Sequence, residues 1–163
     1  MIMVYVTMFG HLVLLAMCLA LSSAETNQRR LLATNTFLVG PVPFSLAFDS
    51  SGNACVTSFI NASVTKLSSL GSTLGTFSVG DRPYGIAIDS FENVWVANVD
   101  NDTVTKLNSL GSILGTFAVG SIPEFIAFDD NNDAWITNFG SNTVSKLSNA
   151  GLYLARLLLT LDP

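Results

Sequence analysis

Histidine is almost absent from this chain of 163 residues, and the only one, His11, lies in an apolar N-terminal stretch. The rest of the chain offers no imidazole for general acid–base catalysis, for a Ser-His-Asp or Cys-His arrangement, or for a histidine zinc site. We therefore assign no catalytic residue, and the sequence favours a binding protein over an enzyme.

Cysteine is also scarce, with Cys18 in the same N-terminal stretch and Cys55 in the remainder. One remaining cysteine excludes an intrachain disulfide. Cys55 stands between two apolar residues in a strand pattern, which predicts a buried and unreactive thiol.

Charged residues make up only 12% of the chain and hydrophobic residues 49%, which is typical of a folded domain. The net charge is −5 and no basic cluster is present, so we expect no nucleic-acid partner. No glycine-rich phosphate-binding pattern occurs either.

Residues 1–24 predict a cleaved secretory signal peptide, followed by a short linker at 25–35. Its apolar core is LVLLAMCLAL at 12–21, and small residues precede a cut after Ala24. The preceding segment has no lysine or arginine, so an uncleaved signal anchor of about one membrane span is the alternative. We expect a secreted, extracellular protein with no stable membrane span once the signal is cleaved, or else a tethered one.

From residue 36 onward the sequence repeats every 40 residues, and 36–75, 76–115 and 116–155 align without a gap. Each repeat holds four short strand patterns separated by turn residues. In the second repeat they cover 84–88, 94–97, 103–107 and 113–119, the last broken by Gly115. Four strands in about 40 residues is the period of a β-propeller blade, so 36–163 is predicted to be an all-β propeller domain with three four-stranded blades.

The repeat motif also resembles a known superfamily. It begins with G-x-x-P-x-x-[IL]-A-[FI]-D, continues after a turn with W-V-A-N or W-I-T-N, and ends with V-T-K-L before a glycine. In the second repeat the motif residues are Gly80, Pro83, 86–89, 95–98, 104–107 and Gly111. This pattern resembles NHL-type repeats and is most similar to blades of the streptogramin B lyase and SMP-30/gluconolactonase-like propellers. The resemblance implies half of a six-bladed propeller, and it implies little about activity because such blades serve binding proteins and enzymes alike.

Residues shared by all three repeats are interpreted as structural. The aspartate that ends each first strand is expected to accept N–H groups of the following turn; these are Asp49, Asp89 and Asp129. The shared glycine and proline are expected to form the corner between blades. We expect the lysine of each V-T-K-L motif on a solvated face, and the tryptophans of the second strands between blades.

Positions that differ between repeats are the candidates for a binding site. By the resemblance, the residue after each blade proline and the residue ending each second strand lie near a mouth of the channel. The ligand-binding candidates are Phe44, Tyr84, Glu124, Asn98 and Asn138. The side-chain oxygens of Glu124, Asn98 and Asn138 are of the type that binds Ca²⁺, but only Glu124 is a carboxylate. We therefore assign no metal ligand and no cofactor, with Ca²⁺ as the alternative.

Two N-glycosylation sequons, Asn61-Ala62-Ser63 and Asn101-Asp102-Thr103, occupy the same position of successive repeats. Both are predicted in an exposed loop, where a eukaryotic host would attach glycans.

Three blades are fewer than the four to eight of a typical propeller. Residues 36–39 predict an outer strand without its own blade, and 156–163 align with the start of a fourth, Pro163 on Pro123. One hypothesis is a part of a longer, roughly six-bladed protein, and the other is a homodimer that closes a six-bladed ring.

Together these observations predict a secreted scaffold that binds a protein, glycan or small ligand at its loop face. The alternative is a metal-dependent hydrolase, lactonase or lyase of the SMP-30/streptogramin lyase-like class, or an inactive fragment of one. Lyase activity in that family depends on a histidine, and this chain departs from the family there.

Overall fold

The computed structural model describes residues 35–157, and from Phe37 onward these residues belong to one compact unit. The predicted signal peptide, nearly all of the linker and residues 158–163 lie outside the described residues. Over 35–157, no helix has the length and apolar character needed to cross a membrane.

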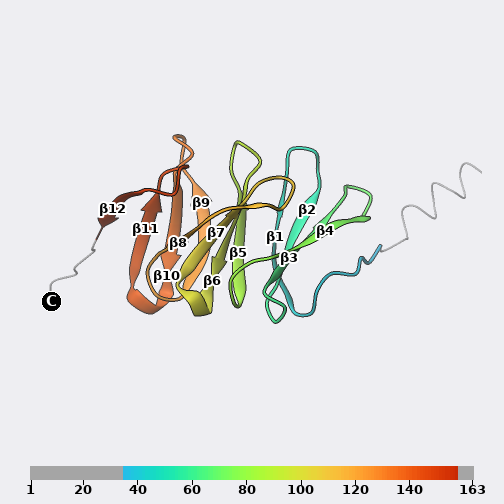
Figure 1. Ribbon diagram of the computed structural model, residues 1–163, viewed down its shortest axis with the longest axis horizontal. Coiled ribbons are helices and arrows are strands. Elements are labelled where there is room, and N and C mark those ends of the chain that lie inside the picture. The colour runs from blue at the N-terminus through green and yellow to red at the C-terminus, as the bar shows by residue number, and fades with distance from the viewer. Residues whose placement is uncertain (1–34, 158–163) are drawn as a thin grey trace, which may run out of the picture. The chain divides into compact units, whose positions relative to one another are not determined.

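The described chain forms three four-stranded antiparallel sheets, each with its strands in chain order (Figure 1). Blade 1 consists of β1 (Pro43–Phe48), β2 (Ala54–Ser58), β3 (Ser63–Leu67) and β4 (Thr73–Ser78). Blade 2 consists of β5 (Pro83–Ile88), β6 (Val94–Asn98), β7 (Thr103–Leu107) and β8 (Ile113–Ala118). Blade 3 consists of β9 (Pro123–Phe128), β10 (Ala134–Asn138), β11 (Thr143–Leu147) and β12 (Tyr153–Leu157). The predicted all-β blades are confirmed.

Two details of the strand prediction were wrong. Gly115 does not end β8, which is continuous from Ile113 to Ala118, but the register with β7 shifts between the pairs Lys106–Gly115 and Leu107–Ile113. Residues 36–39 form no strand. In each blade the outer strand forms hydrogen bonds with the third strand of the same blade. Within 35–157, residues 36–39 have no such third strand beside them, so they do not form a strand.

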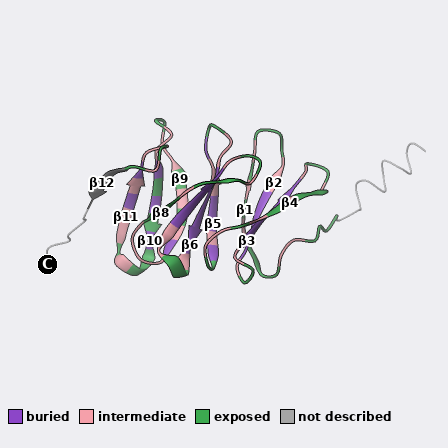
Figure 2. Ribbon diagram, viewed as in Figure 1, coloured by how far each residue is buried: buried purple, intermediate pink, exposed green. Residues whose placement is uncertain are grey.

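The apolar core lies in the two joints between blades, and Figure 2 shows that the buried residues concentrate there. Between blades 1 and 2 it is formed by Cys55, Val64, Ile86, Val94, Val96 and Leu107. Between blades 2 and 3 it is formed by Trp95, Val104, Ala134, Ile136 and Leu147. Cys55 is buried, as predicted, and burial raises the pKa of its thiol to about 11.

A shared phenylalanine and a shared glycine form a wedge at each joint. Gly111 has φ +86°, a left-handed conformation that favours glycine, and a Cβ there would lie 2.0 Å from the ring of Phe77. Phe117 lies in the same way over Gly151, and Phe37 over Gly71. The outer strand of one blade therefore packs on a turn of the next, which explains why both residue types are invariant among the repeats.

The shared aspartate organises the turn after each first strand, as predicted. Asp89 Oδ1 accepts the N–H groups of Phe91 and Asn93, both at 2.9 Å. Its Oδ2 accepts Trp95 Nε1 at 2.9 Å and pairs with Lys106 Nζ at 3.4 Å. Trp95 is fully buried between blades 2 and 3, which confirms the predicted inter-blade tryptophan.

The prediction that the shared lysines face solvent was wrong. The side chains of Lys66 and Lys106 are only 10% and 7% exposed. The reason is that each ammonium group reaches across the joint: Lys66 Nζ donates to the Ser109 carbonyl at 3.1 Å, and Lys106 Nζ to the Asn149 carbonyl at 2.7 Å. We call the aspartate, the lysine and this carbonyl the lysine clasp.

The clasp changes the acidity of its carboxylates. Burial raises the pKa of Asp49, but hydrogen bonds from Asn53 and the Lys66 ammonium outweigh burial and lower the pKa to about 2. Burial also raises the pKa of Asp89, but the hydrogen bonds from Trp95 and Asn93 outweigh this effect, so the pKa of Asp89 is lowered as well.

The lowered pKa values predict how acid destabilises the fold. The unfolded pKa of an aspartate is about 3.9, so the unfolded chain binds the proton first as pH falls. We expect the stabilisation by the Asp49 clasp, about 1 kcal/mol after solvent screening, to be complete above about pH 4 and lost towards pH 2.

Urea unfolding at a series of pH values from 6 down to 2 measures this loss. Asp49→Asn should be less stable at pH 6 and should lose less stability on acidification than the parent. Asp130→Asn, at an exposed position in an equivalent turn, should keep the parent's profile. Equal acid sensitivity of the Asp49→Asn variant and the parent would contradict the account.

Candidate functional site

One end of the blades carries the corners that lead from each blade to the next, and we call it the corner end. There the corner residue before each blade proline accepts a hydrogen bond from the turn after the second strand, as in Phe59 N to Val42 O at 3.1 Å. The same bond joins Val99 to Arg82 at 3.2 Å. Val42, Arg82 and Ile122 all have φ near +50°, so this left-handed backbone is a common requirement of the corners.

Two of the predicted ligand-binding residues, Asn98 and Asn138, are buried behind the corners. Asn98 Nδ2 donates to the hydroxyls of Thr103 and Thr105, and its Oδ1 accepts the Gly80 N–H at 3.1 Å. A Cβ on Gly80 would lie 2.5 Å from the Asn98 amide carbon, so this corner requires glycine. The structure therefore gives Asn98 a structural place, holding the corner.

Asn138 has a similar buried place in blade 3, but there the Gly120 N–H donates to the Ser145 hydroxyl and not to the asparagine. Its Nδ2 donates to the hydroxyls of Thr143 and Ser145 at 3.1 and 2.9 Å. Both asparagines thus direct their amides towards the third strand, and neither meets the half-buried Glu124 at the start of β9.

The other two candidates, Phe44 and Tyr84, lie together at the corner end of β1 and β5, with ring centroids 3.8 Å apart. Phe59 extends this row on one side at 5.9 Å from Phe44, and Phe125 on the other at 5.8 Å from Tyr84. The structure thus brings two of the five predicted residues into direct contact, within a row of four aromatic rings.

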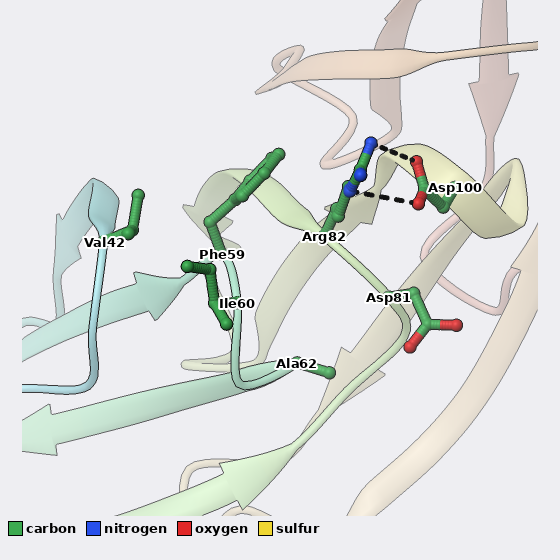
Figure 3. Close-up of a pocket in the computed structure, with 7 residues that line it drawn as sticks. All are labelled: Val42, Phe59, Ile60, Ala62, Asp81, Arg82 and Asp100. Atoms are coloured by element: carbon green, nitrogen blue, oxygen red, sulfur yellow. Dashed lines mark hydrogen bonds and ion pairs between the residues drawn. The ribbon is translucent and has the colours of Figure 1, made fainter.

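A cavity of about 590 Å³ opens beside this row, between blades 1 and 2. Blade 1 and its preceding corner supply an apolar side, formed by Val42, Phe59, Ile60 and Ala62. Blade 2 and its corner supply a charged side, formed by Asp81, Arg82 and Asp100 (Figure 3). The cavity therefore suits a molecule with one apolar face and several polar groups.

Arg82 is the central polar group of the cavity. Its guanidinium pairs with the Asp100 carboxylate through Nε at 3.2 Å and Nη1 at 3.4 Å, and its Cζ lies 5.6 Å from the Phe59 ring centroid. The side chains of Arg82 and Asp100 are 57% and 43% exposed, so both can contact a ligand. Two carboxylates against one guanidinium leave the charged side with a net negative charge.

The described residues do not gather three or more His, Cys, Asp or Glu side chains in an arrangement that could hold a metal ion. Ca²⁺ binding is neither supported nor tested by this geometry, and it stays a prediction.

Sequence reasoning missed the residues that line the cavity. It selected the residue after each proline and the last residue of each second strand, whereas Arg82 precedes its proline and Phe59 and Asp100 follow the strand end. For Arg82 and Asp100 the signal was present, because these positions hold a different residue in each repeat, as in Val42, Arg82 and Ile122. For Phe59 it was weaker, because the third repeat has phenylalanine there too, as Phe139.

The two sequons lie at the corner end as well. Asn61 is exposed and stands between two residues that line the cavity. Asn101 is exposed too, but its amide is engaged with Asp81, donating to Oδ2 at 3.2 Å and accepting the backbone N–H. Asn61 is thus the freer of the two predicted glycosylation sites.

No family model and no curated protein matches the chain. Several solved structures, in contrast, are similar to the chain. Streptogramin B lyase is 25% identical over 67% of this chain and 38% of its own, with a TM-score of 0.62. A catalytically inactive virginiamycin B lyase from Staphylococcus aureus, with quinupristin, is 19% identical over 73% of this chain and 41% of its own, with a TM-score of 0.63. Hydrazine synthase from Kuenenia stuttgartiensis is 18% identical over 77% of this chain and 38% of its own, with a TM-score of 0.67.

These similarities and the three sheets define the class: the chain is an all-β protein built of consecutive β-propeller blades. The predicted resemblance to streptogramin B lyase is confirmed as one of fold. The chain spans about two fifths of the length of these solved chains.

The buried position of Asn98 predicts a structural effect of its removal. Asn98→Ala leaves the Gly80 N–H and two threonine hydroxyls without their partner, so we expect it to lower the free energy of unfolding by about 2–3 kcal/mol. Asn131→Ala, at an exposed turn position, should change it by less than about 0.5 kcal/mol. Urea titration measures both, and an unchanged midpoint for Asn98→Ala would contradict the structural assignment.

Proposed function

We propose that the chain is a non-catalytic binding scaffold and that its ligand docks in the corner-end cavity between blades 1 and 2. The observation that carries the proposal is that the contacts holding the blades together are repeated, whereas the lining of the cavity is largely not. The clasps, wedges and corners recur from blade to blade, whereas six of the seven residues that line the cavity differ from their equivalents in both other repeats; the seventh, Phe59, recurs only as Phe139. A repeated frame leaves such positions free to vary for a ligand.

The chemistry of the cavity favours a neutral saccharide. A sugar ring has an apolar C–H face that fits the side formed by Phe59 and Ile60, and hydroxyls that can bond to Arg82, Asp81 and Asp100. Charged groups make stronger hydrogen bonds with hydroxyls than neutral groups do. The excess of carboxylates disfavours an anionic ligand, and the half-exposed Arg82–Asp100 pair offers donors and acceptors side by side.

Secretion through the predicted signal peptide belongs to this proposal and rests on the sequence alone, as does the NHL-type character of the repeats. The metal-dependent hydrolase or lyase stays the alternative. The neighbour structure with quinupristin concerns that lyase, and this chain resembles it in fold.

An array of neutral and acidic oligosaccharides, probed with the labelled chain and followed by calorimetry on the best binder, tests the proposal. We expect binding to neutral saccharides, and at least tenfold weaker binding for Phe59→Ala and for Arg82→Ala. Phe91→Ala removes an exposed ring from the β5–β6 turn at the opposite end and should bind like the parent. No saccharide binding, or unchanged affinity of both cavity variants, would overturn it.

A further inference from the structure

The chain builds the same joint between blades twice, and each joint has a donor face and an acceptor face. At the second joint, the edge of Trp95 on blade 2 meets Phe128 on blade 3 at 5.8 Å, and Lys106 reaches the Asn149 carbonyl. At the first joint, the Thr57 hydroxyl of blade 1 donates to the Tyr84 carbonyl of blade 2 at 3.2 Å.

Blade 3 carries a complete donor face that nothing covers within the described residues. Trp135, Thr137 and Lys146 are the repeat equivalents of Trp95, Thr57 and Lys106. Trp135 is 38% exposed, against 0% for Trp95.

These residues are held ready for the contact. Trp135 Nε1 donates to Asp129 at 2.8 Å, and Lys146 pairs with the same carboxylate at 3.0 Å, as their equivalents do with Asp89. The Thr137 hydroxyl accepts the Phe125 N–H at 3.2 Å, as Thr57 does for Ser45. Lys146 also pairs with Asp133, in place of a carbonyl on a following blade.

Blade 1 carries the matching acceptor face. Phe48 is the repeat equivalent of Phe128 and is 64% exposed. Beside it a shallow cavity of about 390 Å³ is lined in part by Phe37, Leu46, Val56 and Leu67. The backbone carbonyls of Phe44 and Ser69 occupy the repeat positions of the carbonyls that Thr57 and Lys66 use on blade 2.

We propose that the partner of these two faces is a second copy of this chain. The acceptor face of blade 1 in one copy packs on the donor face of blade 3 in the other, with Phe48 against Trp135. Lys146 then donates to the Ser69 carbonyl and Thr137 to the Phe44 carbonyl. Two such joints close a ring of six blades, within the four to eight of a typical propeller.

The internal joints argue for this occupant over an unrelated protein. Each contact in the proposed joint reproduces, between equivalent positions, a contact that the chain makes with itself at a measured distance. An unrelated partner would need to present an aromatic edge and two carbonyls in the same arrangement.

One segment must adjust in the ring. Phe37 lies over Gly71 of blade 1, as Phe77 lies over Gly111 of blade 2 and Phe117 over Gly151 of blade 3. The ring that covers the blade 1 glycine therefore comes from the segment before blade 1 in the same chain. Leu157 is the repeat equivalent of Phe37. The end of β12 in one copy and Phe37 in the other therefore require the same place, and ring closure displaces one of them.

Size-exclusion chromatography with light scattering on the purified chain tests the proposal. We expect twice the mass of one chain for the parent and a single-chain mass for Phe48→Glu and for Trp135→Lys. The double variant Phe48→Glu/Trp135→Lys places opposite charges across each joint and should restore the double mass at low salt. Phe91→Glu changes an exposed ring away from both faces and should leave the mass unchanged.

Circular dichroism shows whether each single variant keeps its strands, and recovery in the double variant excludes a folding defect as the cause of dissociation. A parent with the mass of one chain would overturn the proposal. So would an open-ended series of larger species, or a dimer that persists in both single variants.

Discussion

The ammonium group of Lys106 is the contact on which the arrangement of the blades depends. It bonds to an aspartate of its own blade and to a turn carbonyl of the next, with the Trp95 ring 4.7 Å away. A buried lysine without these partners would be costly, so the next blade must present its carbonyl at this place. The clasp therefore fixes how one sheet sits on another, while the apolar contacts supply most of the burial free energy.

This constraint divides each blade into an end where residues are shared among the repeats and an end where they differ. The clasps hold the turns at one end of the blades, where Asp49, Asp89 and Asp129 organise them, and leave the corner end to vary. Arg82 and Asp100 lie at that free end and differ from their equivalents in both other repeats. The clasp is also directional. Within residues 35–157, blade 2 uses both of its faces, while the donor face of blade 3 and the acceptor face of blade 1 are uncovered.

Local chemistry was predictable from the sequence, and long-range chemistry was not. The aspartate turns follow from side chain–backbone bonds within four residues, as from Asn53 to Asp49. The burial of Lys66 depends on a carbonyl 43 residues away, which no local pattern reveals. In the candidate site, the symmetry argument selected Phe44 and Tyr84, which the structure places in contact, but it missed Arg82. The reason is that the corner backbone also turns the residue before the proline towards the cavity.

A double-mutant cycle between Lys106 and Asn149 tests whether the lysine is coupled across the joint to the side chain of the residue whose carbonyl it binds. Besides its carbonyl, Asn149 offers a side-chain oxygen to Lys106 Nζ at 2.9 Å and an N–H group to Asp89 at 3.1 Å. The free energies of unfolding of Lys106→Met, Asn149→Ala and the double variant should show a coupling of about 1 kcal/mol or more. Effects that add to within about 0.3 kcal/mol would contradict an energetic coupling of Lys106 to Asn149 across the joint through the side-chain contacts.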